Sequence, residues 1–298
     1  MASRQDIEFE SEGTTLRGWL YTSAETGEAQ PTVVMAHGYS AVKEQYLDRY
    51  AEVFAARGLA VVVFDHANFG ASDGETRQEV DPQRQIRGYR DAISFAQTRP
   101  ELDPDRIGVW GTSYSGGHAL VVAAHDKRVR AVVSQVPTIN GFENAQRRTP
   151  PHKVAAQRAA MDADRLARFR GEPPVMVPVV AEGSGPCALP GADSYDFFTV
   201  SAEWATSWRN EVTFRSAEMA REYSPVHDIG LISPTPLLLI VAENDVLTLT
   251  DVQLAAYEQA LEPKALRIIP GGHFAPYVEQ FTETSDAAAD WFAQHLIR

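Results

Sequence analysis

The chain has 298 residues, of which 44% are apolar, 22% charged and 9% aromatic, an ordinary globular composition that excludes a disordered chain, a collagen-like fibre and a coiled coil. The formal net charge is −13 and the densest basic spot is the pair Arg147 and Arg148, so nucleic acid is not an expected partner. No apolar run approaches the roughly 18 residues that a membrane span needs, so a membrane is not an expected partner either.

The chain carries a single cysteine, Cys187, so it cannot form an internal disulfide. The segment Met1–Glu8 lacks the apolar core of a secretory signal peptide. Both features favour the cytoplasm as the location. Because Cys187 lies in a loop rich in Gly and Pro with no adjacent histidine, we expect a thiol without a chemical role.

The first elements are expected to be two antiparallel strands. Apolar and polar residues alternate in Ile7–Glu10 and Leu16–Thr22, and the turn Glu12-Gly13 separates the two segments. The alternation predicts an edge of a sheet with one face in water. An exposed edge strand can pair with a second copy of the chain, which leaves a homodimer open.

Continuous apolar runs then follow and predict a parallel sheet that is buried on both faces. The runs are Thr32–Ala36, Leu59–Phe64, Arg106–Trp110, Val129–Val136 and Pro236–Ala242. Segments with helical spacing lie between them, such as Tyr46–Arg57, which Gly58 ends, and Ala288–Leu296. The sequence therefore predicts an α/β fold with a mostly parallel central sheet, helices on both faces and right-handed crossovers.

One long stretch interrupts this alternation of strands and helices. Residues 137–233 contain no βαβ unit but several prolines, the amphipathic pieces Lys153–Arg170 and Ser216–Tyr223, and an aromatic cluster. A stretch of this length within a compact domain is usually functional. We therefore expect a core domain at 1–136 and 234–298, and a helical cap inserted at 137–233 over one end of the sheet.

The strongest chemical signal is the segment Arg106–Gly117, in which a strand runs into Gly-Thr-Ser-Tyr-Ser-Gly and a helix follows. This is the context of a nucleophile elbow, and it predicts Ser113 as the nucleophile. The sharp turn needs small neighbours two residues away on each side, and Gly111 and Ser115 meet that need. The alternative is a serine that only caps the helix.

A second serine, Ser72, lies in the better literal match, Gly70-Ala-Ser-Asp-Gly. No strand runs directly into this segment, and the residues that follow it, Glu75–Arg84, are polar. We therefore expect Ser72 to be a turn residue.

A serine nucleophile needs a base and an acid that orients the base. Among eight histidines, His273 is the best placed, in a glycine-rich loop after the last expected strand, Leu266–Ile269. The acid should follow the strand before that, and Asp245 is the candidate, with Glu243 as its rival and helix capping as the alternative role. The other histidines are interpreted as structural.

An oxyanion hole needs two donors that are in position before the reaction. The backbone N–H of Tyr114, next to the nucleophile, is one candidate. The other is the backbone N–H of Tyr39, in the loop His37-Gly-Tyr-Ser after an expected strand, for which a simple tight turn is the alternative interpretation.

The order Ser113, Asp245, His273 resembles the α/β-hydrolase superfamily, as do His37-Gly-Tyr and the segment Asp65–Gly74. Several pieces are similar to the branch that holds bacterial esterase-like hydrolases and fungal polyketide transferases: Trp19-Leu-Tyr, His37–Glu44, Asp103–Gly108, Gly191–Phe198 and Pro270–Phe274. The Ser113-Tyr114 pair also resembles the cocaine-esterase and X-prolyl peptidase group. One departure is Ser115, where the family motif more often has Gly.

Three functions are compatible with these residues. The first is a serine hydrolase that cleaves an ester or thioester of a small-molecule acyl substrate through an acyl-serine intermediate. The second passes the acyl group to an alcohol or amine with the same residues, and the third is a binding protein without catalysis. No metal or nucleotide motif is present, so no cofactor is expected. Apolar and aromatic residues usually line such pockets, and the cap offers Tyr195, Phe197, Phe198 and Trp204.

Overall fold

A computed structural model describes residues 3–23 and 28–297. Its centre is an eight-stranded sheet in the order β1-β2-β4-β3-β5-β6-β9-β10. The pairings of β1 with β2 and of β2 with β4 are antiparallel, and all other pairings in the sheet are parallel. The strands are β1 (Ser3–Ser11), β2 (Thr14–Thr22), β3 (Gln30–Ala36), β4 (Ala60–Phe64), β5 (Leu102–Thr112), β6 (Val129–Gln135), β9 (Leu237–Ala242) and β10 (Lys264–Ile269).

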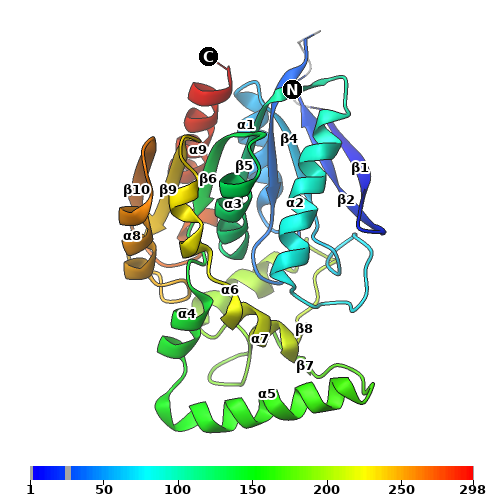
Figure 1. The fold of residues 1–298 in the computed structure, drawn as a ribbon, viewed down its shortest axis with the longest axis vertical. Helices are drawn as coiled ribbons and strands as arrows, with labels where there is room; N and C mark the ends of the chain where they lie inside the picture. Colours follow the sequence, from blue (N-terminus) through cyan, green and yellow to red (C-terminus); the bar gives the residue numbers. More distant parts are fainter. Residues whose placement is uncertain (1–2, 24–27, 298) are drawn as a thin grey trace.

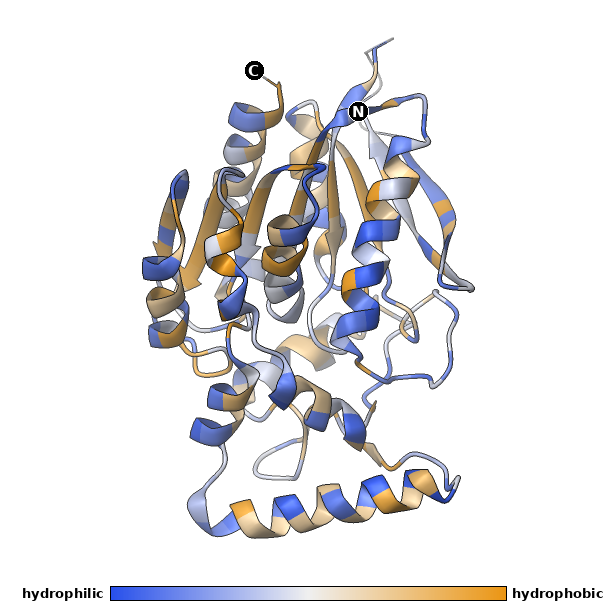
Figure 2. Ribbon diagram, in the orientation of Figure 1, coloured by the Kyte–Doolittle hydropathy of each residue, from blue (hydrophilic) through white to orange (hydrophobic). Residues whose placement is uncertain are grey.

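The burial of each strand follows its sequence pattern. Every residue of β3, β4 and β9 is buried, as expected for continuous apolar runs in the middle of a sheet that is covered on both faces. In β1 the inner face is buried through Ile7, Phe9 and Ser11, whereas the outer face is exposed. Figure 2 shows the central strands as the most apolar part of the ribbon.

Helices cover both faces of the sheet (Figure 1). On one face α1 (Leu47–Ala56) packs against α9 (Phe281–Phe292), and on the other α2 (Pro82–Gln97) packs against α3 (Tyr114–His125). The helix α8 (Thr250–Gln259) packs on β9. The helix α2 begins at a local signal, because the carboxylate of Asp81 accepts hydrogen bonds from the backbone N–H groups of Gln83 and Arg84.

The segment between β6 and β9 adds no strand to the main sheet. It holds α4 (Gly141–Arg148), α5 (Val154–Phe169), α6 (Ala192–Ser201), α7 (Phe214–Glu222) and the small sheet of β7 (Met176–Val177) and β8 (Val212–Thr213). These elements lie beyond one end of the main sheet, and α5 runs across the far end of the molecule (Figure 1). They form the inserted helical cap of the fold.

Short helical turns complete the chain at Pro151–Lys153, Pro225–His227, Ile229–Leu231, Ala275–Tyr277 and Ala293–Ile297. Within residues 3–23 and 28–297, each helix is too short or too polar to cross a lipid bilayer.

Candidate active site

Ser113 lies in the tight turn between β5 and α3. Its backbone has φ 56° and ψ −118°, a sparsely populated conformation that side-chain-bearing residues adopt at a cost. Two hydrogen bonds hold it there: the Ser113 N–H donates to the carbonyl oxygen of Gln135 at 2.8 Å, and the N–H of Thr138 donates to the Ser113 carbonyl at 2.9 Å. A Cβ at Gly111 would lie 1.9 Å from the Ser115 carbonyl oxygen, so the turn requires glycine at that position.

The Ser113 hydroxyl is the first member of a hydrogen-bonded line of three side chains. The Oγ of Ser113 is 2.9 Å from Nε2 of His273, and Nδ1 of His273 is 2.7 Å from Oδ2 of Asp245. Ser113 caps no backbone N–H of α3 with its side chain. The three residues follow β5, β9 and β10, whose carboxyl ends meet at one edge of the sheet.

Asp245 is buried and strongly hydrogen-bonded. Its Oδ1 accepts from the backbone N–H groups of Leu247 and Thr248, both at 2.9 Å, and its Oδ2 accepts from the Thr248 hydroxyl at 2.7 Å. Burial alone raises the pKa of Asp245, but the adjacent His273 and these hydrogen bonds outweigh burial and lower the pKa to about 2. An ionised Asp245 accepts the Nδ1–H of His273, which leaves Nε2 as the acceptor for the Ser113 hydroxyl.

The rival acid, Glu243, is exposed, and the side-chain contact of its carboxylate is a 3.3 Å hydrogen bond from Asn244. Glu243 directly follows β9 and points to solvent, whereas Asp245, two residues further along the loop, is buried.

The loop after β3 lies directly against Ser113. A Cβ added to Gly38 would be 2.9 Å from the Ser113 Cβ and 3.3 Å from its Oγ, so only glycine permits this approach. Within the described residues, the backbone N–H groups of Tyr39 and Tyr114 donate no hydrogen bond to another protein group. The rings of the two tyrosines pack edge to face, with centroids 5.5 Å apart. Two unused donors therefore flank the serine.

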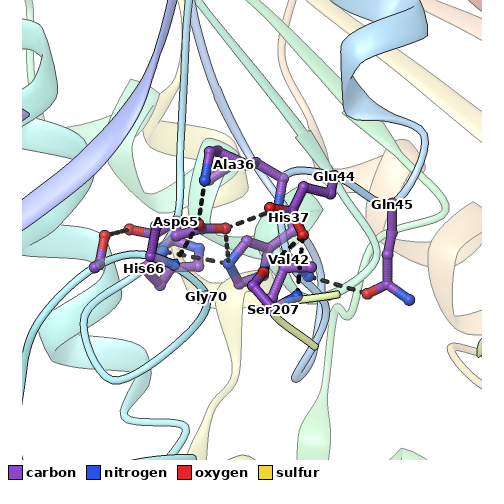
Figure 3. Close-up of polar contacts among 12 residues, drawn as sticks. Ala36, His37, Val42, Glu44, Gln45, Asp65, His66, Gly70 and Ser207 are labelled. Atoms are coloured by element: carbon purple, nitrogen blue, oxygen red, sulfur yellow. Dashed lines mark hydrogen bonds and ion pairs between the residues drawn. The ribbon is translucent and has the colours of Figure 1, made fainter. Parts of the chain in front are cut away.

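Buried polar contacts hold this loop in place (Figure 3). The carboxylate of Asp65, which directly follows β4, accepts from the backbone N–H of Lys43 at 2.7 Å and from its Nζ at 2.6 Å. The carboxylate also accepts from the Ala71 N–H, and a Cβ at Gly70 would overlap it. On the cap side, the Ser207 hydroxyl donates to Glu44 at 2.7 Å.

Ser115 explains how the elbow accommodates a departure from glycine. Its hydroxyl donates to the carbonyl oxygen of His37 and accepts from Nε2 of His66 at 2.9 Å. The side chain therefore joins the start of α3 to the loops after β3 and β4. Since the hydroxyl is small and both of its contacts are satisfied, Ser115 strengthens the elbow rather than distorting it.

Three histidines are buried around this junction, and burial lowers the pKa of each. The imidazole of His37 accepts from the His66 N–H at 3.2 Å. Burial, followed by the nearby His37, holds the pKa of His66 well below its usual value, and burial and His37 lower the pKa of His118 to about 3. His118 contacts the Tyr223 hydroxyl and the Gln85 side chain, each at 2.8 Å. All three are neutral structural residues.

The remaining sequence alternatives also lie away from Ser113. Ser72 is a buried turn residue, as expected, whose hydroxyl accepts from the Arg17 N–H at 2.8 Å and donates to the Asp65 carbonyl at 2.6 Å. His125 contacts Asp228 at the surface. Neither residue lines the cavity described next.

A cavity of about 550 Å³ lies between the core and the cap, and Ser113 and His273 are in its wall together with Tyr39 and Tyr114. The cap contributes Phe197 and Phe198, as expected from the sequence. The expectation for Tyr195 and Trp204 is corrected, because neither lines the cavity. Trp204 is 46% exposed and its indole N–H donates to the Glu44 carbonyl, while Tyr195 packs against the core from the partly buried side of α6.

Other residues of the wall were not predicted from the sequence. The inner face of α4, with Asn144 and Arg148, and the aromatic ring of Phe274 line the cavity, and so does Cys187. The pair Arg147 and Arg148 stands out in the sequence, but it was interpreted only as a basic spot for nucleic-acid binding and not as part of a cavity. The support of Asp245 by Thr248 could have been suspected from their spacing of three residues.

Comparisons with known proteins agree with the fold. Residues 12–275 match the family model described as X-Pro dipeptidyl-peptidase (S15 family). The thiohydrolase aneE of Aspergillus aculeatus is 35% identical over 267 residues, which are 88% of this chain and 83% of that protein. The polyketide transferase grgF of a Penicillium species is 32% identical over 296 residues, with 98% and 97% coverage.

The solved structure of the α/β hydrolase GrgF from Penicillium sp. sh18 superposes with a TM-score of 0.86 at 28% identity and covers 99% of this chain and 100% of that one. The family match extends through most of the chain, and the relatives span nearly its full length. The chain therefore belongs to the X-Pro dipeptidyl-peptidase (S15) family and has the α/β-hydrolase fold.

Proposed function

We propose that this protein is a serine hydrolase that cleaves a carboxylic ester or thioester of a small acyl substrate, with Ser113, His273 and Asp245 as its catalytic triad. The observation that carries the proposal is the line from the Ser113 Oγ through both nitrogens of His273 to the Asp245 carboxylate, with contacts of 2.9 and 2.7 Å, in the wall of the cavity. The relatives named above are a thiohydrolase and a polyketide transferase, which favours acyl chemistry over peptide cleavage.

In the first half of the reaction, the Ser113 Oγ attacks the acyl carbon and its proton passes to Nε2 of His273. Asp245 holds Nδ1–H and stabilises the imidazolium that forms. The tetrahedral intermediate collapses, the bond to the leaving oxygen or sulfur breaks, and His273 returns the proton to the leaving group. In the second half, water adds to the acyl-serine with the same proton transfers and releases the acid.

The oxyanion of each intermediate is expected to receive hydrogen bonds from the backbone N–H groups of Tyr39 and Tyr114. Support comes from the two unused donors on either side of Ser113 and from the close approach of Gly38. The start of α3 adds the favourable field of a helix N-terminus. Because Asp65 and Lys43 hold the loop before the substrate binds, the donors need no reorganisation during the reaction.

Acyl transfer is the second candidate, because one relative is named a polyketide transferase and the cavity is largely apolar. The two functions share the acyl-serine and differ in which nucleophile resolves it. Incubation of the protein with a simple acyl thioester, with and without an alcohol in excess, separates them by product analysis. A free acid in both mixtures indicates hydrolysis, and an ester that forms only with the alcohol indicates transfer.

The proposal as a whole is tested with a fluorophosphonate that reacts with activated serines. The intact protein should gain the mass of one phosphonyl group, the Ser113→Ala variant should gain none, and the Ser72→Ala variant should react like the unchanged protein. A native protein that stays unlabelled and turns over no ester would instead favour the binding protein without catalysis. The cytoplasmic location and the homodimer stay predictions.

A further inference from the structure

The inner face of α4 forms the part of the cavity wall that the triad does not use. Gly141, Asn144, Ala145 and Arg148 line the cavity, at the spacing of one helical face. Figure 1 shows α4 between the main sheet and α5, on the cap side of the site. The guanidinium of Arg148 reaches the loop that carries Asp245, where it donates to the Leu247 carbonyl at 3.5 Å.

Arg148 forms no salt bridge in the described part of the chain, although the more distant carboxylate of Asp245 acts on it electrostatically. Its side chain forms no ion pair there, and its Nε–H is buried with no hydrogen-bond partner. Burial lowers the pKa of Arg148 more than the nearby Tyr39 and Asp245 raise it, and the residue as a whole is partly exposed. The neighbouring Arg147, by contrast, is exposed and contacts Asp251 at 2.6 Å and Glu143 at 3.5 Å. A guanidinium with several unused donors is costly to bury unless an acceptor completes it.

The charges of the cavity differ from those of the whole protein. The chain carries a net charge of −13, yet no Asp or Glu is among the described residues that line the cavity. Its permanent charges are Arg148 and Arg221, and the only side-chain hydrogen bond of Arg221 within the described residues is a 3.4 Å contact to Gln157. The described part of the cavity wall therefore has no acidic side chain that repels an anion, and it has two guanidinium groups that attract an anion.

Asn144 adds a second unsatisfied group on the same face. It is 5% exposed, lies one helical turn before Arg148, and its side-chain oxygen is buried without a partner. Buried polar atoms of a folded protein are nearly always satisfied, so these atoms on one face of α4 indicate a polar group that the site receives from outside. The amide oxygen of Asn144 accepts hydrogen bonds and does not bind an anion, so the donor that points to an anion is the Nε–H of Arg148.

We propose that Arg148 forms a subsite for a carboxylate carried by the substrate. The inference rests on the proposed ester or thioester chemistry at Ser113 and specifies its substrate class: an ester with an anionic group, either on the acyl half or on the alcohol half. The guanidinium pairs with the carboxylate and so holds the ester in the cavity near Ser113. A planar guanidinium matches a carboxylate with two parallel hydrogen bonds, which an ammonium group cannot reproduce.

Three matched substrates test the subsite at constant pH and ionic strength. One is the neutral ester 4-nitrophenyl hexanoate, one is mono-4-nitrophenyl adipate with a carboxylate on the acyl half, and one is 4-carboxyphenyl hexanoate with a carboxylate on the alcohol half. Relative to the neutral ester, Arg148→Gln should lower kcat/KM for one of the two anionic esters by about 30-fold or more, mainly through KM. Arg148→Lys should restore part of this loss.

The neighbouring variant Arg147→Gln is the matched control, because it removes the same charge from the adjacent, ion-paired position. It should change kcat/KM for all three esters alike and by little. The proposal is overturned if Arg148→Gln lowers kcat/KM for all three esters by the same factor. Arg148 would then only hold α4 to the loop of Leu247 through its hydrogen bond. The proposal is also overturned if Arg148→Gln leaves kcat/KM unchanged for all three esters.

A binding measurement separates failure of the subsite from failure of the proposed chemistry. If the protein turns over no ester and the fluorophosphonate leaves it unlabelled, the chemistry at Ser113 fails, and the subsite is then tested by calorimetric titration with adipate and with hexanamide. Binding of adipate that is lost in Arg148→Gln but kept in Arg147→Gln supports the subsite. Equal binding by the two variants, or no binding of adipate to the unchanged protein, overturns it.

Discussion

Mild acid should destabilise this protein through the histidines buried beneath the elbow. His37, His66 and His118 are buried with a lowered pKa, so the folded protein keeps them neutral at pH values where the unfolded chain takes up protons. For a histidine with a depressed pKa, stability is complete above the unfolded pKa of about 6.5 and is lost as the pH falls below it. The loss continues until the folded pKa is reached.

The magnitude follows from His118, whose pKa is lowered to about 3. Between pH 6.5 and pH 5 the unfolded chain binds this proton and the folded protein does not, which costs about 1.36 kcal/mol for each pH unit, or about 2 kcal/mol at pH 5. His66 and His37 add to the loss in the same direction. The carboxylate of Asp245, with a pKa of about 2, adds nothing in this window because it stays ionised.

Urea unfolding followed by circular dichroism at pH 7.5 and pH 5.0 measures the effect. The unfolding free energy should fall by at least about 2 kcal/mol at pH 5.0, with an unchanged dependence on urea. In His118→Gln the absolute stability is lower at both values, because the contact with Tyr223 changes, but the difference between them should shrink by about 2 kcal/mol.

The reasoning is refuted if the unchanged protein is equally stable at pH 7.5 and pH 5.0. It is also refuted if His118→Gln keeps the full pH dependence, since the protons would then be taken up elsewhere.

The other predictions concern the triad and the elbow. Ser113→Ala should lower turnover of an activated ester by about 10⁴- to 10⁶-fold with unchanged thermal stability, and near-normal turnover would remove Ser113 from the mechanism. Asp245→Asn should lower kcat by about 10⁴-fold because the amide no longer selects the Nδ1–H tautomer of His273, whereas Glu243→Gln should leave kcat unchanged; equal losses would reassign the acid. In Gly38→Ala the new methyl group would meet Ser113 at 2.9 Å and displace the Tyr39 N–H, so kcat should fall by about 10²- to 10³-fold while KM changes little; full activity would exclude this loop from the oxyanion site.

Much of the fold was predictable because its signals are local. A continuous apolar run such as Leu237–Ala242 is compatible with a strand covered on both faces, and the structure places β9 there. The elbow was equally visible, because a strand, a small-residue turn and a helix are consecutive in the chain. The helix α2 was not predicted, although Asp81 and Pro82 mark its start, because the segment Glu75–Arg84 is polar.

The cap was the least predictable part. The aromatic residues of α6 and of the segment after it form a cluster in the sequence, but which of them face the cavity depends on how this part of the cap packs against the core. Phe197 stacks on Phe274, with ring centroids 4.5 Å apart, and so lies inward, while Trp204 turns outward to Glu44. No spacing within the cap encodes that choice.

The order and spacing of residues were enough to indicate a parallel sheet, a sharp turn at Ser113 and two loops after neighbouring strands that bring Asp245 and His273 to the same edge, because each of these depends on neighbours in the chain. Only the folded molecule decided that Ser115 joins two loops, that three histidines are held neutral, and that Arg148 faces the cavity without a salt bridge in the described residues while Arg147 is paired. These properties arise from burial and from partners that are distant in sequence. Both change the free energy of a charged group, and neither can be read from the residues next to it in the chain.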